Sequence, residues 1–99
     1  MNTLIRTGEF DAWLRALRDP RGEARILLRL RSVSKGNFGD CQPVGDGISE
    51  MRIHSGPGYR VYFTRRGEVI YLLILGGDKS TQARDIKRAK AILETLPKE

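Results

Sequence analysis

The sequence predicts an α+β domain in which an N-terminal strand and a helical hairpin pack on a twisted antiparallel sheet, followed by a C-terminal helix. Apolar residues recur every three or four positions between Thr7 and Gly36 and again over Ser80–Leu96, as they do on one face of a helix. Between these segments they recur at every second position, as they do in strands. A chain of 99 residues can bury one hydrophobic core but not two, so residues 1–99 are expected to form a single domain.

The N-terminal part is expected to hold a short strand, Leu4–Arg6, and two helices. Thr7 can cap the first helix through its hydroxyl. Asp19-Pro20 ends that helix and begins the second, with Asp as the N-cap and Pro at the first helical position. Gly36 is a C-cap candidate. The apolar stripes are Phe10, Trp13, Leu14 and Leu17 in the first helix and Ile26, Leu27, Leu30 and Val33 in the second.

The middle of the chain is expected to form an antiparallel meander. Strand candidates are Gln42–Val44, Ile48–His54, Tyr59–Thr64 and Val69–Leu75, and Asp46-Gly47 is a strong hairpin turn signal. Val69–Leu75 is apolar on both faces, as in a central strand that is covered on both sides. Gly76–Lys79 is expected to break this strand. Asp78, Ser80 or Thr81 can then cap the last helix.

The charge of the chain is basic and uneven. There are 18 Lys and Arg against 12 Asp and Glu, which gives a net charge of +6. Residues 1–50 hold 8 basic and 7 acidic side chains, whereas residues 51–99 hold 10 and 5. This balance suggests a polyanionic partner that contacts mainly the second half of the chain, although a basic domain without a nucleic-acid role has the same composition.

Several function classes are excluded by residue types that are rare in the chain. Cys41 is the only cysteine, so an internal disulfide and a thiolate metal site are both excluded. His54 is the only histidine, which excludes mechanisms that need two. No stretch reaches the roughly 18 apolar residues of a membrane span, and the N-terminus has no apolar signal core. A cytoplasmic location is expected.

One face of the predicted sheet gathers polar side chains. Arg52 and His54 lie on one strand, Arg60 and Tyr62 on its hairpin neighbour, and Lys79 follows the central strand. Cleavage of RNA needs a general base for the 2′-OH, cations that stabilise the phosphorane and an acid for the 5′-oxygen. The planar fork of arginine suits the phosphate, and tyrosine can stack on a base. These side chains are therefore candidates for a ribonuclease site.

Each candidate also has a purely structural explanation. Arg52 and Arg60 fit solvated cross-strand residues that pair with Glu50, and His54 fits a surface residue before a turn. Tyr62 fits a residue that closes the sheet edge. The remaining candidates fit helix caps or solvated helix faces, and they are Lys79, Gln82, Arg21, Arg25, Arg29, Arg84, Lys87 and Arg88.

Five segments carry a resemblance to a known family. They are Phe10–Leu14, Gly36–Asp40, Val44–Ile53, Gly56–Phe63 and Leu75–Gln82. In these segments Gly-Pro-Gly-Tyr-Arg-Val-Tyr-Phe is followed about a dozen residues later by Gly-Gly-Asp-Lys. Over about residues 2–96 the chain resembles the RelE/ParE superfamily of type II toxins. It most closely resembles the small branch of addiction-module killer proteins that are related to HigB toxins.

The resemblance implies a RelE-like fold of one strand, two helices, a meander and a last helix. It also implies a growth-inhibiting toxin that a cognate helix-turn-helix antitoxin neutralises. RelE- and HigB-like members cleave mRNA in the ribosomal A site, whereas ParE-like members inhibit DNA gyrase. Arg60 matches the arginine that acts on the scissile phosphate, Arg52 lies about where a strand lysine is found, and Lys79 falls near a second catalytic basic residue.

The chain departs from these enzymes in its last helix, because Ser80–Leu96 contains no Tyr or His. Tyr62, His54 or Glu50 would then have to assist proton transfer. We expect a ribosome-dependent mRNA interferase that uses neither metal nor cofactor, with Arg60, Arg52 and Lys79 at the phosphorane. The RNA-binding residues would be Arg21, Arg25, Arg29, Gln82, Arg84, Lys87 and Arg88.

The expected partners are the antitoxin, the ribosome and mRNA, with operator DNA reached only through the antitoxin and no membrane. Two alternatives stay open. One is a ParE-like, non-enzymatic gyrase inhibitor. The other is a chain that mainly binds its antitoxin and has little toxicity.

Overall fold

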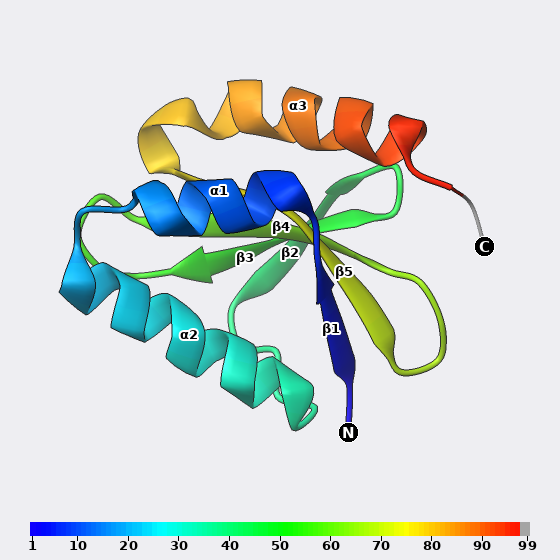
Figure 1. The fold of residues 1–99 in the computed structure, drawn as a ribbon, viewed down its shortest axis with the longest axis horizontal. Coiled ribbons are helices and arrows are strands. Elements are labelled where there is room, and N and C mark those ends of the chain that lie inside the picture. The colour runs from blue at the N-terminus through cyan, green and yellow to red at the C-terminus, as the bar shows by residue number, and fades with distance from the viewer. Residues whose placement is uncertain (98–99) are drawn as a thin grey trace.

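The chain forms an α+β fold in the computed structural model, which describes residues 1–97 (Figure 1). In chain order the elements are β1 (Thr3–Arg6), α1 (Gly8–Ala16), α2 (Pro20–Ser34), β2 (Cys41–Gly45), β3 (Ile48–Ile53), β4 (Tyr59–Arg65), β5 (Ile70–Asp78), the 3-10 helix η1 (Lys79–Thr81) and α3 (Gln82–Thr95). The expected domain of residues 1–99 includes residues 98 and 99, which lie outside the described part. Within residues 1–97, none of the helices is long and apolar enough to cross a membrane.

The five strands form one sheet in the order β1-β5-β4-β3-β2. The antiparallel meander from β2 to β5 confirms the prediction. The expectation of a wholly antiparallel sheet is wrong, because β1 pairs in parallel with β5, with Thr3 opposite Ile70 and Arg6 opposite Leu73. The direction of a strand leaves no trace in its side-chain alternation, so the sequence pattern could not distinguish the two arrangements.

The helices cover both faces of the sheet, with α1 and α2 on one side and α3 on the other (Figure 1). The expected single core is therefore two clusters of buried side chains, one on each face. The first consists of Phe10, Leu14, Ile26, Leu30, Val33, Met51, Ile53, Tyr59, Val61, Phe63 and Leu73. The second consists of Ile48, Tyr62, Leu72, Ile74, Leu75, Ala89 and Ile92. Leu27, expected in the inward stripe of the second helix, is 40% exposed.

The helix starts follow the predicted capping chemistry at two of three places. The hydroxyl of Thr7 accepts a hydrogen bond from the amide of Phe10 at 3.0 Å, and Asp19 accepts one from the amide of Gly22 at 3.0 Å. Asp78 caps η1, and Thr81, the third candidate, occupies the N-cap position of α3 without a side-chain hydrogen bond, so α3 begins at Gln82, two residues later than expected. This short extra turn separates β5 from α3.

The glycine pair Gly76-Gly77 was expected to break the central strand, but β5 continues through both residues to Asp78. A Cβ atom on Gly76 would lie 2.1 Å from Cε3 of Trp13, and one on Gly77 would lie 1.9 Å from Oδ2 of Asp85. The glycines are therefore explained by side chains that pack on the strand backbone, Trp13 from α1 and Asp85 from α3. Gly in a strand often marks such a close approach, as well as a bend or a bulge.

Candidate functional site

Strands β3 and β4 place four of the expected residues on the face covered by α3. Glu50 lies opposite Tyr62, and Arg52 lies opposite Arg60. Oε1 of Glu50 is 3.1 Å from Nε of Arg52, and Oε2 is 3.6 Å from Nε of Arg60. Gln82, at the start of α3, donates a hydrogen bond to Oε2 of the same carboxylate. The cross-strand pairing predicted from alternation is confirmed, and Glu50 lies at its centre.

Both arginines of this cluster are held in place by further acceptors. Nη1 of Arg60 donates to the carbonyl oxygens of Gly58 and Tyr59 at 3.2 and 3.3 Å, and its side chain is only 9% exposed. Nη2 of Arg52 donates to Oε1 of Gln42 at 2.7 Å. A phosphate on this face would therefore meet two arginines whose charge Glu50 partly compensates.

Tyr62 and Glu50, which were expected to assist proton transfer, are both buried in the structure. Tyr62 is fully buried, and within residues 1–97 its hydroxyl has no hydrogen-bond partner. Burial first, and the neighbouring Glu50 carboxylate second, raise the pKa of this hydroxyl well above its ordinary value. The Glu50 side chain is 1% exposed beneath the arginines. Neither group reaches a substrate on the surface, because α3 covers this part of the sheet.

His54 lies one residue beyond β3 and pairs with a carboxylate that the sequence reasoning missed. Its Nε2 is 2.7 Å from Oδ2 of Asp40, and the two side chains are 71% and 44% exposed. The hydrogen bond from His54 is the main reason why the pKa of Asp40 lies below its ordinary value, and the charge of Arg52 adds to it. The register of β2 on β3, with Cys41 opposite Met51, places Asp40 beside the end of β3. A correct alignment of these two strands would have found it.

A hollow of about 360 Å³ brings three of the expected residues together. It is lined by His54, Ser55, Gly56, Pro57, Gly58, Arg60 and Lys79. Lys79 is exposed in η1, directly after β5. A Cβ atom on Gly58 would lie 3.4 Å from Cβ of Lys79 and 3.5 Å from Nη1 of Arg60, so both side chains flank this glycine. We call this site the His54 hollow; Glu50, Arg52 and Tyr62 do not line it.

The arginine row on α2 divides into two kinds of residue. Arg21 and Arg25 are exposed, as expected of a surface that binds a polyanion. Arg29 is not available for RNA, because its guanidinium donates to the carbonyl oxygens of Phe38 at 2.8 Å, of Asp40 at 3.4 Å and of Arg52. Spacing along a helix could not show that the segment before β2 returns to α2 at this point.

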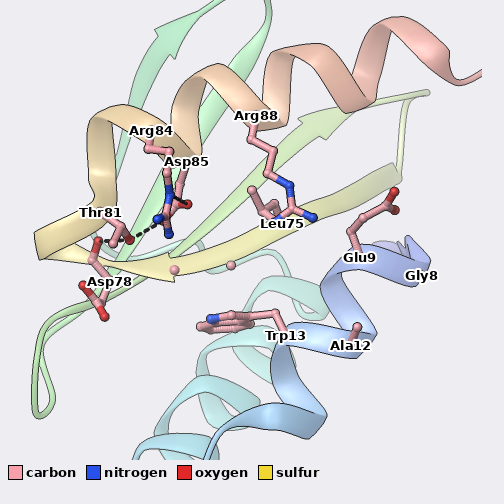
Figure 2. A pocket seen from close by; sticks show the side chains of 12 residues that line it. Gly8, Glu9, Ala12, Trp13, Leu75, Asp78, Thr81, Arg84, Asp85 and Arg88 are labelled. Carbon is pink, nitrogen blue, oxygen red and sulfur yellow. Dashed lines mark hydrogen bonds and ion pairs between the residues drawn. The ribbon is translucent and has the colours of Figure 1, made fainter.

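The α3 face contains exposed cations and a second, larger hollow. Arg84, Lys87 and Arg88 are exposed, whereas Gln82 is engaged with Glu50 and does not form part of an open RNA surface. Figure 2 shows a groove of about 650 Å³ between α1 and α3, with Trp13 below β5 and the side chains of Arg84 and Arg88 above it. In its wall Thr81 donates a hydrogen bond to the buried Asp85 at 2.5 Å.

The groups that could bind a metal or react as nucleophiles are few. Within residues 1–97, no three His, Cys, Asp or Glu side chains are grouped so that they could hold a metal ion. Burial raises the pKa of the Cys41 thiol, whose Sγ donates to the carbonyl oxygen of Phe38 at 3.3 Å. This thiol is kept protonated and is a poor nucleophile.

The chain is similar to a protein found by comparison with known proteins. Over 87 residues the chain is 48% identical to a protein of Haemophilus influenzae that is described only as an uncharacterized protein. The chain belongs to the same family as this protein. The match covers 88% of each chain, so the family extends over most of the fold. No family model matches the chain.

Proposed function

We propose that the chain is the toxin of a type II toxin–antitoxin system and an mRNA interferase with a RelE-like fold, neutralised by a cognate helix-turn-helix antitoxin. The observation that carries this proposal is the His54 hollow, where an exposed imidazole lies beside Arg60 and Lys79. In cleavage of RNA by its own 2′-OH, an imidazole can act as the general base and two cations can stabilise the phosphorane, while water supplies the proton for the 5′-oxygen. The order of strands and helices supports the RelE-like fold.

In this mechanism His54 is the general base. Because its Nε2 is paired with Asp40, Nδ1 is the nitrogen that can take the 2′-OH proton. The 2′-oxygen attacks the adjacent phosphorus, and the bond to the 5′-oxygen breaks. Lys79 and Arg60 stabilise the charge of the phosphorane. The leaving 5′-oxygen takes a proton from water, and the imidazolium gives its proton to the hydroxide that remains. The products are a 2′,3′-cyclic phosphate and a 5′-hydroxyl.

The exposed cations outside the hollow would bind the ribosome. Arg21 and Arg25 lie on α2, and Arg84, Lys87 and Arg88 lie on α3, so they flank the sheet on its two sides. Contacts of these side chains with rRNA phosphates position the chain without reading a sequence, and they make binding sensitive to salt. Codon preference would arise closer to the hollow.

The proposal is tested by induced expression in cells that lack the antitoxin, followed by sequencing of the RNA fragments that carry a hydroxyl at their 5′ end. We expect growth arrest and cuts at codons in the ribosomal A site. His54→Ala and Lys79→Ala should abolish both, whereas Lys35→Ala, an exposed lysine at the end of α2, should behave as wild type. Arrest without such cuts, or full cutting by both hollow variants, would overturn the proposal.

A ParE-like gyrase inhibitor is the second candidate function. It is favoured by the burial of Tyr62 and by the ion pairs that tie Arg52 and Arg60 to Glu50, since both leave fewer groups for chemistry. Growth arrest with intact translation and an induced DNA-damage response would support this candidate. Normal growth on induction would instead indicate a chain that mainly binds its antitoxin.

A further inference from the structure

We infer that Asp40 and Arg29 are positioning residues that orient the imidazole of His54 toward its role in the hollow. The inference rests on the proposed function of the site and adds two residues to it. Neither residue lines the hollow itself. Asp40 acts through its contact with His54, and Arg29 acts through the backbone segments that carry Asp40 and His54. The contacts that support this inference join α2, the segment before β2 and the end of β3.

The first step is the pairing of His54 with Asp40. At 2.7 Å, Oδ2 of Asp40 accepts a hydrogen bond from Nε2. In the neutral imidazole this selects the tautomer with the proton on Nε2 and leaves Nδ1 as the acceptor. A carboxylate in this place also stabilises the imidazolium that forms when the 2′-OH proton is taken. The pair thus supplies an oriented base where an isolated surface histidine would rotate freely.

The second step is the anchoring of both partners by one guanidinium. Arg29 donates to the carbonyl oxygens of Phe38 and Asp40 on one side and of Arg52 on the other. The amide of Arg52 also donates to the carbonyl oxygen of Asp40 at 2.9 Å. Arg29 therefore joins the segment that carries Asp40 to Arg52, which lies near the end of β3 and two residues before His54.

Gly39 shows how closely this anchor fits. It has φ of +69°, and a Cβ atom there would lie 2.8 Å from Nη2 of Arg29. A side chain at this position would conflict with the left-handed backbone and with the guanidinium at once. The backbone of the segment before β2 therefore fits closely around the guanidinium of Arg29.

Cations lie on both sides of His54. His54 separates the His54 hollow, with Arg60 and Lys79, from a second hollow of about 340 Å³ on α2 that is lined by Arg25 and Arg29. The charge of Arg52 also acts on the pair through Asp40. Among these cations, Asp40 is the carboxylate that the structure pairs with the imidazole, so it holds the ring in one orientation.

Because His54 is the only histidine, its imidazole gives unambiguous NMR signals, and the coupling can be measured without any activity. In the neutral ring of the wild type we expect ring-nitrogen chemical shifts that place the proton on Nε2, and in Asp40→Asn we expect this preference for one tautomer to be lost. Arg29→Gln should weaken the same preference in a folded protein. Asp11→Asn, which changes an exposed carboxylate on α1 that pairs with Arg6, is the matched control and should leave the tautomer unchanged.

An unchanged tautomer in Asp40→Asn would overturn the inference even if the chain cleaves RNA. A lost tautomer preference in a chain that cleaves no RNA would leave the pairing intact and remove the proposed function. In the cleavage assay Asp40→Asn should reduce the rate about tenfold. The same change in a His54→Gln background should have no further effect, and additive losses would contradict action through His54.

Discussion

Replacing Glu50 with glutamine is expected to destabilise the fold far more than a typical surface change. The substitution keeps the size of the side chain and removes the charge that faces Arg60 and Arg52. Arg60, 9% exposed, would then be a buried cation without its counter-ion, whereas Arg52, 29% exposed, can be solvated in part. Breaking a buried pair costs about 3–5 kcal/mol, and we expect a value near the lower end, about 3 kcal/mol.

The measurement is urea unfolding at pH 7, followed by circular dichroism, for wild type and Glu50→Gln. For a domain of this size about 3 kcal/mol corresponds to a fall in Tm of roughly 12–24 °C. The double variant Glu50→Gln/Arg60→Gln should recover part of the loss, because no buried charge is then left unpaired. A loss below about 1 kcal/mol, or no recovery in the double variant, would show that the cluster behaves as a solvated surface pair and refute the reasoning.

Three further predictions concern packing, capping and pH. Gly77→Ala should cost about 2–3 kcal/mol in urea unfolding, because its methyl group would lie 1.9 Å from the carboxylate of Asp85. Thr7→Ala should cost about 2 kcal/mol in the same assay, since the buried hydroxyl both caps α1 and donates to a β5 carbonyl at 2.6 Å. The hydrogen bond of Tyr59 to Asp19 raises the pKa of Tyr59 from 10.0 to about 12. Its contribution is complete below about pH 10 and is lost as pH rises through 12, so the urea midpoint of wild type should fall in this range more steeply than that of Tyr59→Phe.

The parts of the fold that depend on local chemistry were predictable from sequence. Thr7 and Asp19 cap their helices through contacts within three residues, and Asp46-Gly47 makes its turn with positive φ at both positions. Alternation in β3 and β4 also determined which side chains share a face, so the pairing of Arg52 with Arg60 followed from the sequence. Each of these features is set by neighbours along the chain or by a single hairpin.

The features that were missed depend on segments that meet only in the folded chain. Gly76 and Gly77 resemble a turn in sequence, and only the approach of Trp13 and Asp85 explains why they lie within a strand. Tyr62 alternates correctly with its neighbours, yet α3 covers it and removes it from any surface site. Arg29 has the spacing of a solvated row, but the segment before β2 returns to it. In all three cases the deciding partner lies on another element or loop of the fold.

These contacts change how the basic composition bears on function. Two of the three cations expected to converge on the sheet face, Arg52 and Arg60, share the carboxylate of Glu50. These two arginines and the glutamate together carry a net charge of only +1. Lys79 is exposed beside the hollow, while Arg60 also holds the carbonyl oxygens of Gly58 and Tyr59. In the proposed function, the attraction of a phosphate to the hollow would therefore depend mainly on Lys79, because Arg60 also pairs with Glu50 and holds the turn before β4. A count of arginines and lysines alone would assign these roles the other way round.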